Sequence, residues 1–147
     1  MHLRTGIVLA ARGGALARML PPFRLGVGGR IGSGRQYMSW IALEDEVGAI
    51  LRAIACEELA GPVNATAPNP VTNEELTKTL GRVLRRPTVL PTPLLPLRAV
   101  YGRELVEHLL VEGQRVLPAR LLATGYAFAR PTLEGALRSM LGRPAAA

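Results

Sequence analysis

The sequence is poor in the residues on which most metal and catalytic sites depend. It has one cysteine, two histidines and a single lysine, Lys78. The lone Cys56 excludes an intramolecular disulfide and suits a reducing compartment, so we expect a cytoplasmic protein. His2 and His108 have no metal-ligand spacing, and the chain contains no G-x-S-x-G, Walker or C-x-x-C motif. The sequence therefore predicts no metal site and no catalytic residues of its own.

Long apolar runs are also missing. None reaches the roughly 18 residues that a membrane-spanning helix needs. The most apolar stretch, residues 88–101, is interrupted by Pro91, Pro93, Pro96 and Arg98. The first residues show no signal-peptide pattern. We expect no contact with a membrane.

Positive charge is abundant, but it is not concentrated. The formal net charge is +7, which is compatible with a nucleic-acid-binding protein. However, only Arg85 and Arg86 are adjacent, and aromatic residues make up 4% of the chain. No basic stripe interleaved with aromatics is present, so we expect no nucleic-acid partner.

A glycine-rich stretch, residues 25–45 (LGVGGRIGSGRQYMSWIALED), is the main candidate for a binding site. Its five glycines allow positive φ angles and close approach of the backbone to a ligand or another chain. Arg35, Gln36 and Trp40 follow within a few residues. A guanidinium, an amide and an indole suit a polar ligand with a flat or anionic part. The alternative is a mobile surface loop that leads into an edge strand.

The same loop contains a G-x-x-G-x-x-G pattern at Gly26, Gly29 and Gly32. A nucleotide-binding turn of this kind needs a strand directly before it and a helix directly after it. Residues 21–24 (PPFR) and 34–37 (GRQY) supply neither. We reject the pattern as a dinucleotide-binding motif.

The N-terminal third predicts two elements. Residues 3–10 are apolar and indicate a strand that is broken near Thr5–Gly6. Apolar residues then recur with helical spacing over residues 16–23. We expect Pro21–Pro22 to end this helix near Met19–Leu20, because a residue before proline is disfavoured in the α region.

A helix is predicted over residues 44–56. Glu44, Asp45 and Glu46 occupy its first turn, where carboxylates complement the helix dipole. We interpret them as capping residues, not as a metal or acid–base site, because consecutive positions point to different faces. The apolar residues that we expect to be buried are Val47, Ile50, Leu51 and Ile54.

The clearest local signal is a capping box at Thr72–Glu75, which predicts a helix through Leu84. A short strand at residues 63–66 precedes it. An extended, proline-rich segment over residues 85–96 follows. The remaining predicted helices cover residues 97–101, 105–110, 118–123 and 132–141.

Three segments together resemble the epimerase-like group of extended short-chain dehydrogenases/reductases. These segments read GGALARMLPPF, GSGRQYMSWI and PVNATAPNPVT. The later segment QRVLPARLLATGYAFARPTLEGAL resembles the C-terminal domain of uncharacterised function in that group. The resemblance covers nearly the whole chain.

The resemblance implies an α/β fold: a partial Rossmann-type fragment, made of the last strands of the sheet, plus a helix-rich C-terminal substrate domain. Residues 1–70 would end the nucleotide-binding domain with a substrate-side loop, and residues 71–147 would form the helical domain. A member of the family is about twice as long. Its first half carries the glycine-rich NAD(P) turn and the Tyr-x-x-x-Lys pair, and neither is present here. Lys78 follows Glu74, not a tyrosine, by four residues.

The resemblance also gives the glycine-rich stretch a role. In extended relatives this region contributes to the substrate pocket, so we expect Arg35, Gln36 and Trp40 to bind substrate. NAD(P) is implied for the full-length family only, and we expect no cofactor to bind tightly to this chain. The expected partner is a missing N-terminal half or a second copy of the chain. The alternatives are a stand-alone α/β binding or dimerisation module and a truncated, non-functional gene product.

Overall fold

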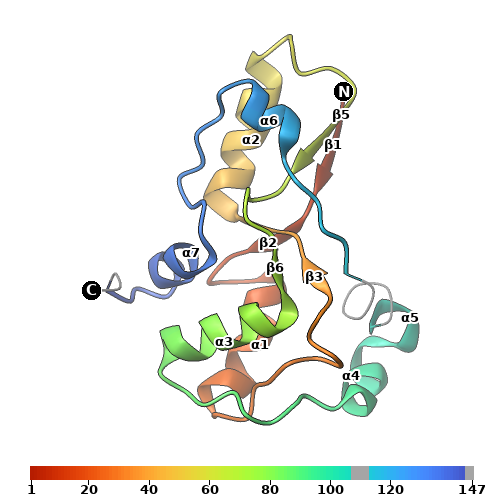
Figure 1. Ribbon diagram of the computed structural model, residues 1–147, viewed down its shortest axis with the longest axis vertical. Helices are drawn as coiled ribbons and strands as arrows, with labels where there is room; N and C mark the ends of the chain where they lie inside the picture. The colour runs from red at the N-terminus through yellow and green to blue at the C-terminus, as the bar shows by residue number, and fades with distance from the viewer. Residues whose placement is uncertain (107–112, 145–147) are drawn as a thin grey trace.

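The computed structural model describes residues 1–106 and 113–144 (Figure 1). Its elements, in chain order, are β1 (His2–Thr5), β2 (Ile7–Leu9), α1 (Gly14–Arg24), β3 (Tyr37–Met38), β4 (Trp40–Ala42), α2 (Leu43–Ala55), β5 (Pro62–Ala65), β6 (Val71–Thr72), α3 (Asn73–Leu84), α4 (Leu94–Tyr101), α5 (Arg103–Leu105), α6 (Ala119–Ala123) and α7 (Leu133–Met140). None of the helices in the described part has the length and apolar character needed to span a bilayer.

The strands form three two-stranded pairs. β1 runs parallel to β5, β2 runs parallel to β4, and β3 runs antiparallel to β6. Gly6 separates β1 from β2, and its N–H donates to the carbonyl of Ala65 at 3.0 Å. The next residue, Ile7, donates instead to Ser39 at 2.8 Å. The chain therefore changes partner strand at Gly6, which confirms the predicted break near Thr5–Gly6.

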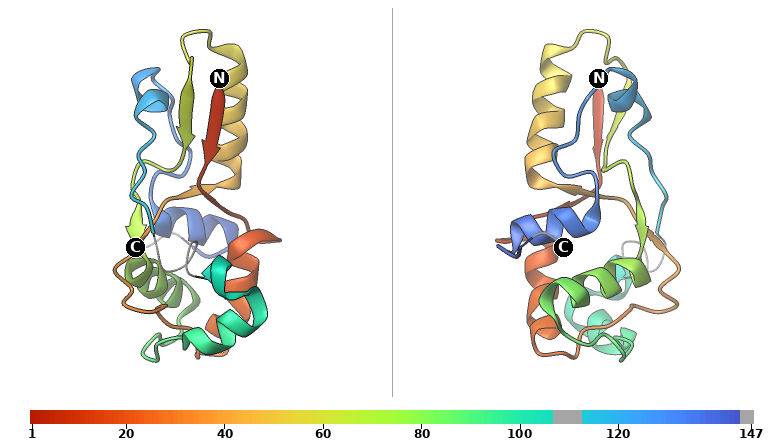
Figure 2. Two further views of the ribbon diagram at one scale, coloured as in Figure 1. Left: turned by 90° about the vertical axis from the view of Figure 1, so that its right-hand side faces the viewer. Right: turned by 60° about the vertical axis from the view of Figure 1, so that its left-hand side comes forward.

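The molecule is elongated (Figures 1 and 2). α2, α6 and the β1–β5 pair lie at one end, and α1, α3 and α4 lie at the other. Parallel strand pairs with flanking helices make this a mixed α/β fold, as expected.

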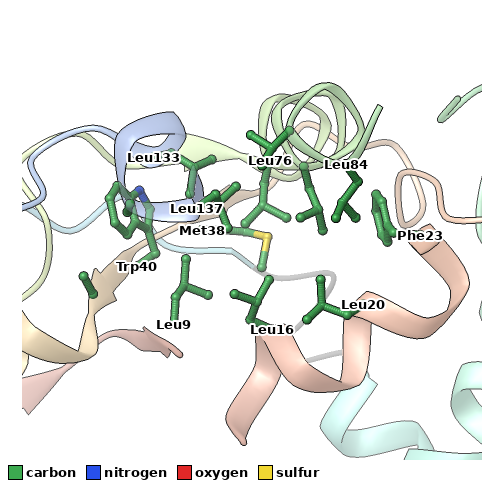
Figure 3. Packing of buried hydrophobic residues seen from close by; sticks show 14 of the residues in the cluster. Leu9, Leu16, Leu20, Phe23, Met38, Trp40, Leu76, Leu84, Leu133 and Leu137 are labelled. Atoms are coloured by element: carbon green, nitrogen blue, oxygen red, sulfur yellow. The ribbon is translucent and has the colours of Figure 1, made fainter. Parts of the chain in front are cut away.

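The larger of two hydrophobic cores lies between α1, α3, α7 and the neighbouring strands (Figure 3). Its buried members are Leu9, Leu16, Leu20, Phe23, Met38, Trp40, Ala42, Ala67, Leu76, Leu80, Val83, Leu84, Leu133, Ala136 and Leu137. α3 contributes Leu76, Leu80, Val83 and Leu84 to this core. The predicted capping box is confirmed, because the Glu75 N–H donates to Thr72 Oγ1 at 3.2 Å and the Thr72 N–H donates to Glu75 Oε2 at 2.6 Å.

The smaller core lies between α2, α6 and the β1–β5 pair. Its buried members are Ile41, Ala49, Ala53, Leu59, Val63, Ala65 and Leu121. Both cores combine residues from either side of residue 70. The division of the chain at that residue stays a prediction.

The helix α2 forms where it was predicted, but its predicted buried face is wrong. Ala49 and Ala53 face the core, whereas Val47 is 49%, Ile50 40%, Leu51 61% and Ile54 76% exposed. The Asp45 carboxylate in its first turn accepts hydrogen bonds from the Ala129 and Arg130 amides, and this contact fixes the rotation of the helix. Tyr126 also lies so close to Gly48 that an added Cβ would be 2.2 Å from its hydroxyl oxygen. These contacts turn the larger apolar side chains outward.

The helix α1 also differs from its prediction, because it continues through Pro21–Pro22 to Arg24. Each proline lacks a donor, but its carbonyl still accepts: Pro21 from Leu25 at 3.1 Å and Pro22 from Val27 at 3.0 Å. Both proline rings are exposed. Buried contacts of the same helix, including Phe23, outweigh the local proline signal.

The C-terminal helices follow the prediction with shifted bounds. α4 begins three residues earlier than expected, and Gly102 ends it as predicted. α6 and α7 match the predicted segments closely. The predicted helix at residues 105–110 lies mostly outside the described residues, and His108 lies wholly outside them.

Candidate functional site

The glycine-rich loop, residues 25–36, connects α1 to β3 and packs tightly against other parts of the chain. A Cβ at Gly28 would lie 2.5 Å from the Phe23 ring, and one at Gly29 would lie 1.5 Å from the Leu90 carbonyl oxygen. Only glycine fits such approaches. These two glycines therefore serve contacts of the chain with itself.

A network centred on Asn73 attaches the loop to the start of α3. The buried Asn73 Oδ1 accepts from the Ile31 N–H at 2.7 Å, and the Asn73 N–H donates to the Gln36 carbonyl at 2.9 Å. Gln36 Nε2 donates to the Ile31 carbonyl at 2.9 Å. The next amide of α3, that of Glu74, donates to the Gly34 carbonyl at 2.9 Å. The carbonyl groups of the loop thus accept hydrogen bonds from the first two amides of α3. Nothing in the sequence pattern had singled out Asn73.

The structure does not bring the three predicted substrate-binding side chains into one pocket. Trp40 is fully buried in the larger core, and its Nε1 donates to the Asn69 carbonyl at 3.0 Å. Gln36 is half-buried and is bound to the loop itself. Arg35 is exposed, and within the described part of the chain its guanidinium has no hydrogen-bond or ion-pair partner. Of the three, Arg35 is the side chain available to an external ligand.

The positive charge of the loop extends to α3. Lys78 Nζ lies 2.8 Å from Glu74 Oε1. This hydrogen bond and the charge of Lys78 lower the pKa of Glu74, with smaller contributions from Arg30 and Arg35. An anion placed beside Arg35 would therefore meet a mainly positive surface that contains one paired carboxylate.

The acidic start of α2 does more than complement the helix dipole. Asp45 is 1% exposed, and its two carboxylate oxygens accept from the Ala129 and Arg130 amides at 2.7 and 2.9 Å. The Tyr126 hydroxyl donates to the Asp45 carbonyl at 3.0 Å. Burial, followed by the charges of Asp45 and Glu46, raises the pKa of Tyr126. The acidic turn is therefore a structural tether for residues 126–130.

Within residues 1–106 and 113–144, no group of three or more His, Cys, Asp or Glu side chains is placed to hold a metal ion. Two of the three consecutive acidic residues at the start of α2, Glu44 and Asp45, make other contacts. Glu44 forms an ion pair with Arg130 at 2.5 Å, and Asp45 holds the C-terminal segment.

The most distinctive surface is apolar. We call it the α2 face: Leu43, Val47, Ile50, Leu51 and Ile54, all at least 40% exposed. Beside it, β1 pairs with β5 along one edge, and no strand of the described residues pairs with its other edge (Figure 2). Contiguous exposed apolar side chains and an open strand edge both favour association.

The chain is similar in sequence to one family model and to several epimerase family proteins. A family model described as "Domain of unknown function (DUF1731)" matches residues 92–140. Epimerase family protein MT2273 of Mycobacterium tuberculosis is 51% identical over 141 residues, which are 96% of this chain and 46% of that protein. Human epimerase family protein SDR39U1 is 43% identical over 139 residues, which are 95% of this chain and 47% of that protein. The homologues are epimerase family proteins. The chain spans about half the length of the curated relatives that it matches.

Solved epimerase-family structures share this fold. The human epimerase family protein crystallised with NADPH superposes with a TM-score of 0.89 at 42% identity, over 95% of this chain and 47% of that one. A nucleoside-diphosphate sugar epimerase from Corynebacterium glutamicum gives 0.67 at 34% identity, over 95% of this chain and 25% of that one. A UDP-glucose 4-epimerase from Thermus thermophilus, at 22% identity, supports the fold alone. The short parallel strand pairs therefore match part of a Rossmann-like epimerase fold.

Proposed function

We propose that this chain is the C-terminal, substrate-binding half of an NAD(P)-dependent epimerase- or reductase-like protein. The observation that carries the proposal is the alignment, which covers 96% of this chain but 46% of its mycobacterial relative. The sequence also carries neither a dinucleotide-binding motif nor a Tyr-x-x-x-Lys pair. Catalysis then requires a nucleotide-binding half that supplies both. The human relative crystallised with NADPH makes NADPH the cofactor to test.

The nucleotide-binding half has a suitable docking surface in the α2 face and the free edge of β1. A strand can add to β1, because strand addition at an exposed sheet edge is made by main-chain hydrogen bonds. A helix packed on the α2 face would then remove Ile50, Leu51 and Ile54 from water. Fully burying such side chains contributes about 1.5–3 kcal/mol each relative to full exposure. The two contacts lie on adjacent elements, so one partner can make both (Figure 2).

Substrate contact is assigned to Arg35, with Gln36 and Trp40 in support. The exposed Arg35 guanidinium can form bidentate hydrogen bonds with a phosphate or carboxylate. Gln36 orients the loop through Ile31, and Trp40 fixes the following strand from within the core. Arg35→Gln should weaken binding of an anionic substrate without changing the melting temperature.

The experiment that tests the proposal is reconstitution. The segment of the Mycobacterium tuberculosis relative that this chain does not match is produced separately and mixed with the chain, and NADPH binding is followed by its fluorescence. We expect a one-to-one complex that binds NADPH. Ile50→Glu/Ile54→Glu should abolish the complex, whereas Val89→Glu, which adds charge at an 84% exposed position away from α2, should not. No complex with the unmodified chain would overturn the proposal.

A second candidate follows from the same exposed face. Two copies of the chain could cover each other's α2 face and form a stand-alone dimer. Sedimentation of the chain alone separates the two ideas. A stable dimer that Ile54→Glu converts to a monomer, with no complex in the reconstitution, would favour the dimerisation module.

A further inference from the structure

A positively charged hollow lies where the C-terminal ends of α1, α3 and α7 converge. It has a volume of about 250 Å³ and is lined by Arg24, Leu84, Arg86, Leu141 and Arg143. Three of the five lining residues are arginines, and none is acidic. No step of the proposed function uses this hollow.

Two of the three helix ends are built in the same way. α3 ends in Leu84-Arg85-Arg86-Pro87, and the end of α7 reads Leu141-Gly142-Arg143-Pro144. In each, the second residue is left-handed, with φ of 56° for Arg85 and 60° for Gly142.

The third residue of each end is the arginine that lines the hollow. Its N–H donates five residues back: Arg86 to Gly81 at 2.9 Å and Arg143 to Arg138 at 2.8 Å. This bond is characteristic of the Schellman helix end, and the proline that follows restricts the backbone of the arginine. The fold therefore presents one leucine and one arginine from each of two helix ends to the same hollow.

The three guanidiniums are not neutralised by the protein. Arg24, Arg86 and Arg143 are exposed, and none of their guanidinium groups has a hydrogen-bond or ion-pair partner within residues 1–106 and 113–144. The carboxylate of Glu134 on α7 is already paired with Arg82 at 2.6 Å and Arg138 at 2.7 Å. The ion pairs of these helices therefore do not compensate the positive charge of the three arginines that line the hollow.

Helix dipoles account for part of this arrangement. A cation near a helix C-terminus is favoured, because each end carries a partial charge of about −0.5. Three such ends offset roughly half of the charge of three guanidiniums. Dipoles also give no reason for the three arginines to line one hollow. A ligand with negative charge supplies that reason.

We propose that the hollow binds the phosphate group of a small phosphorylated molecule. Each arginine guanidinium can form two hydrogen bonds with phosphate oxygens. Three such guanidinium groups can therefore bind a phosphate or a diphosphate. Leu84 and Leu141 offer an apolar surface to the carbon part of the ligand. The volume is below the 300–1,000 Å³ typical of sites for drug-sized ligands, which favours a compact ligand.

The test is a titration of the 147-residue chain, followed by NMR at constant ionic strength, with inorganic phosphate, pyrophosphate and glucose 1-phosphate as probes. We expect saturable shifts in residues 84–87 and 141–144. Arg86→Gln and Arg143→Gln should each weaken binding about tenfold. Arg86→Lys should restore part of the affinity, because it keeps the charge but loses the fork. Arg12→Gln, which removes a charge from an exposed turn elsewhere, should have no effect.

The outcomes separate the alternatives. Tighter binding of glucose 1-phosphate than of phosphate, lost in Leu141→Ala, would assign the site to a phosphate ester. Equal binding of the two would assign it to free phosphate. The proposal is overturned if no probe saturates the wild-type chain, or if Arg12→Gln weakens binding as much as Arg86→Gln. A lower melting temperature of Arg86→Gln without any phosphate binding would reduce the arginines to helix-end stabilisers.

Discussion

The helices α2 and α3 have similar length and similar apolar periodicity, yet α3 buries its large apolar side chains and α2 exposes them. α3 buries its leucines and valine against α1 and α7. α2 buries alanines against one strand pair and exposes its leucines, isoleucines and valine. Apolar residues at helical spacing therefore identify a helix face that can be buried. Whether that face is buried depends on the elements that pack against the helix. The α2 face has no cover within the described residues, and we assign its cover to a partner.

The largest expected difference between α2 and α3 is in the free energy of unfolding lost when a leucine of each helix is truncated to alanine. Leu80→Ala on α3 removes a fully buried side chain and should lower the free energy of unfolding by about 2–5 kcal/mol. Leu51→Ala on α2 starts from a 61% exposed side chain and should change it by less than about 0.5 kcal/mol. Urea unfolding of both variants measures the difference. Equal losses would contradict the assignment of α2 as an uncovered helix.

A charge on the α2 face should affect association instead of folding. Ile54→Glu should leave the unfolding midpoint of the chain nearly unchanged, because its side chain is already in water. It should weaken the reconstituted complex by about 2 kcal/mol or more, as expected for an apolar interface anchor. Calorimetric titration against the nucleotide-binding half gives the value, with Val89→Glu as the matched control. A complex of unchanged affinity would remove α2 from the interface.

The N-terminal caps provide a third comparison. Thr72→Ala removes the capping box of α3 and should cost about 1 kcal/mol. Thr132→Ala at the start of α7 should cost only a few tenths, because the Thr132 side chain makes no capping hydrogen bond. Thermal unfolding of the two variants checks the ranking. A larger loss for Thr132→Ala would show that the cap geometry is misassigned.

The smallest effect is expected from the ion pairs of Glu134. The hydrogen bond from Arg138, together with the charges of Arg82 and Arg138, lowers the pKa of Glu134 below its ordinary 4.5. A lowered folded pKa stabilises the protein above the unfolded value, and this stability is lost as the pH falls through the folded pKa. Glu134→Gln should therefore reduce the melting temperature slightly at pH 7 and by less at pH 3. An equal reduction at both values would contradict an ionic origin.

Local signals predicted much of the fold. The capping box at Thr72–Glu75, the break at Gly6 and the end of α4 at Gly102 each depend on neighbouring residues alone, and each is present. The course of α1 through Pro21–Pro22 was not predictable, because long-range burial of Phe23 outweighs the proline signal.

Tertiary contacts explain the other differences. The rotation of α2 depends on Asp45 and on residues 126–130, about eighty positions away in the sequence. Trp40 was assigned to the candidate site because it follows Arg35 and Gln36 closely in the sequence, and the sequence did not show that it is buried in the larger core, where its Nε1 donates to the Asn69 carbonyl. Substrate binding by Arg35 stays a prediction that the Arg35→Gln variant can test.

The most direct test of the docking surface is an NMR titration of the isotopically labelled chain with the separately produced nucleotide-binding half. We predict that amide shifts concentrate in β1, residues 2–5, and along α2, residues 43–55, while α3 and α7 stay unchanged. Shifts centred on α3 or α7, or no shifts at saturating concentration, would contradict the assignment of α2 and β1 as the interface.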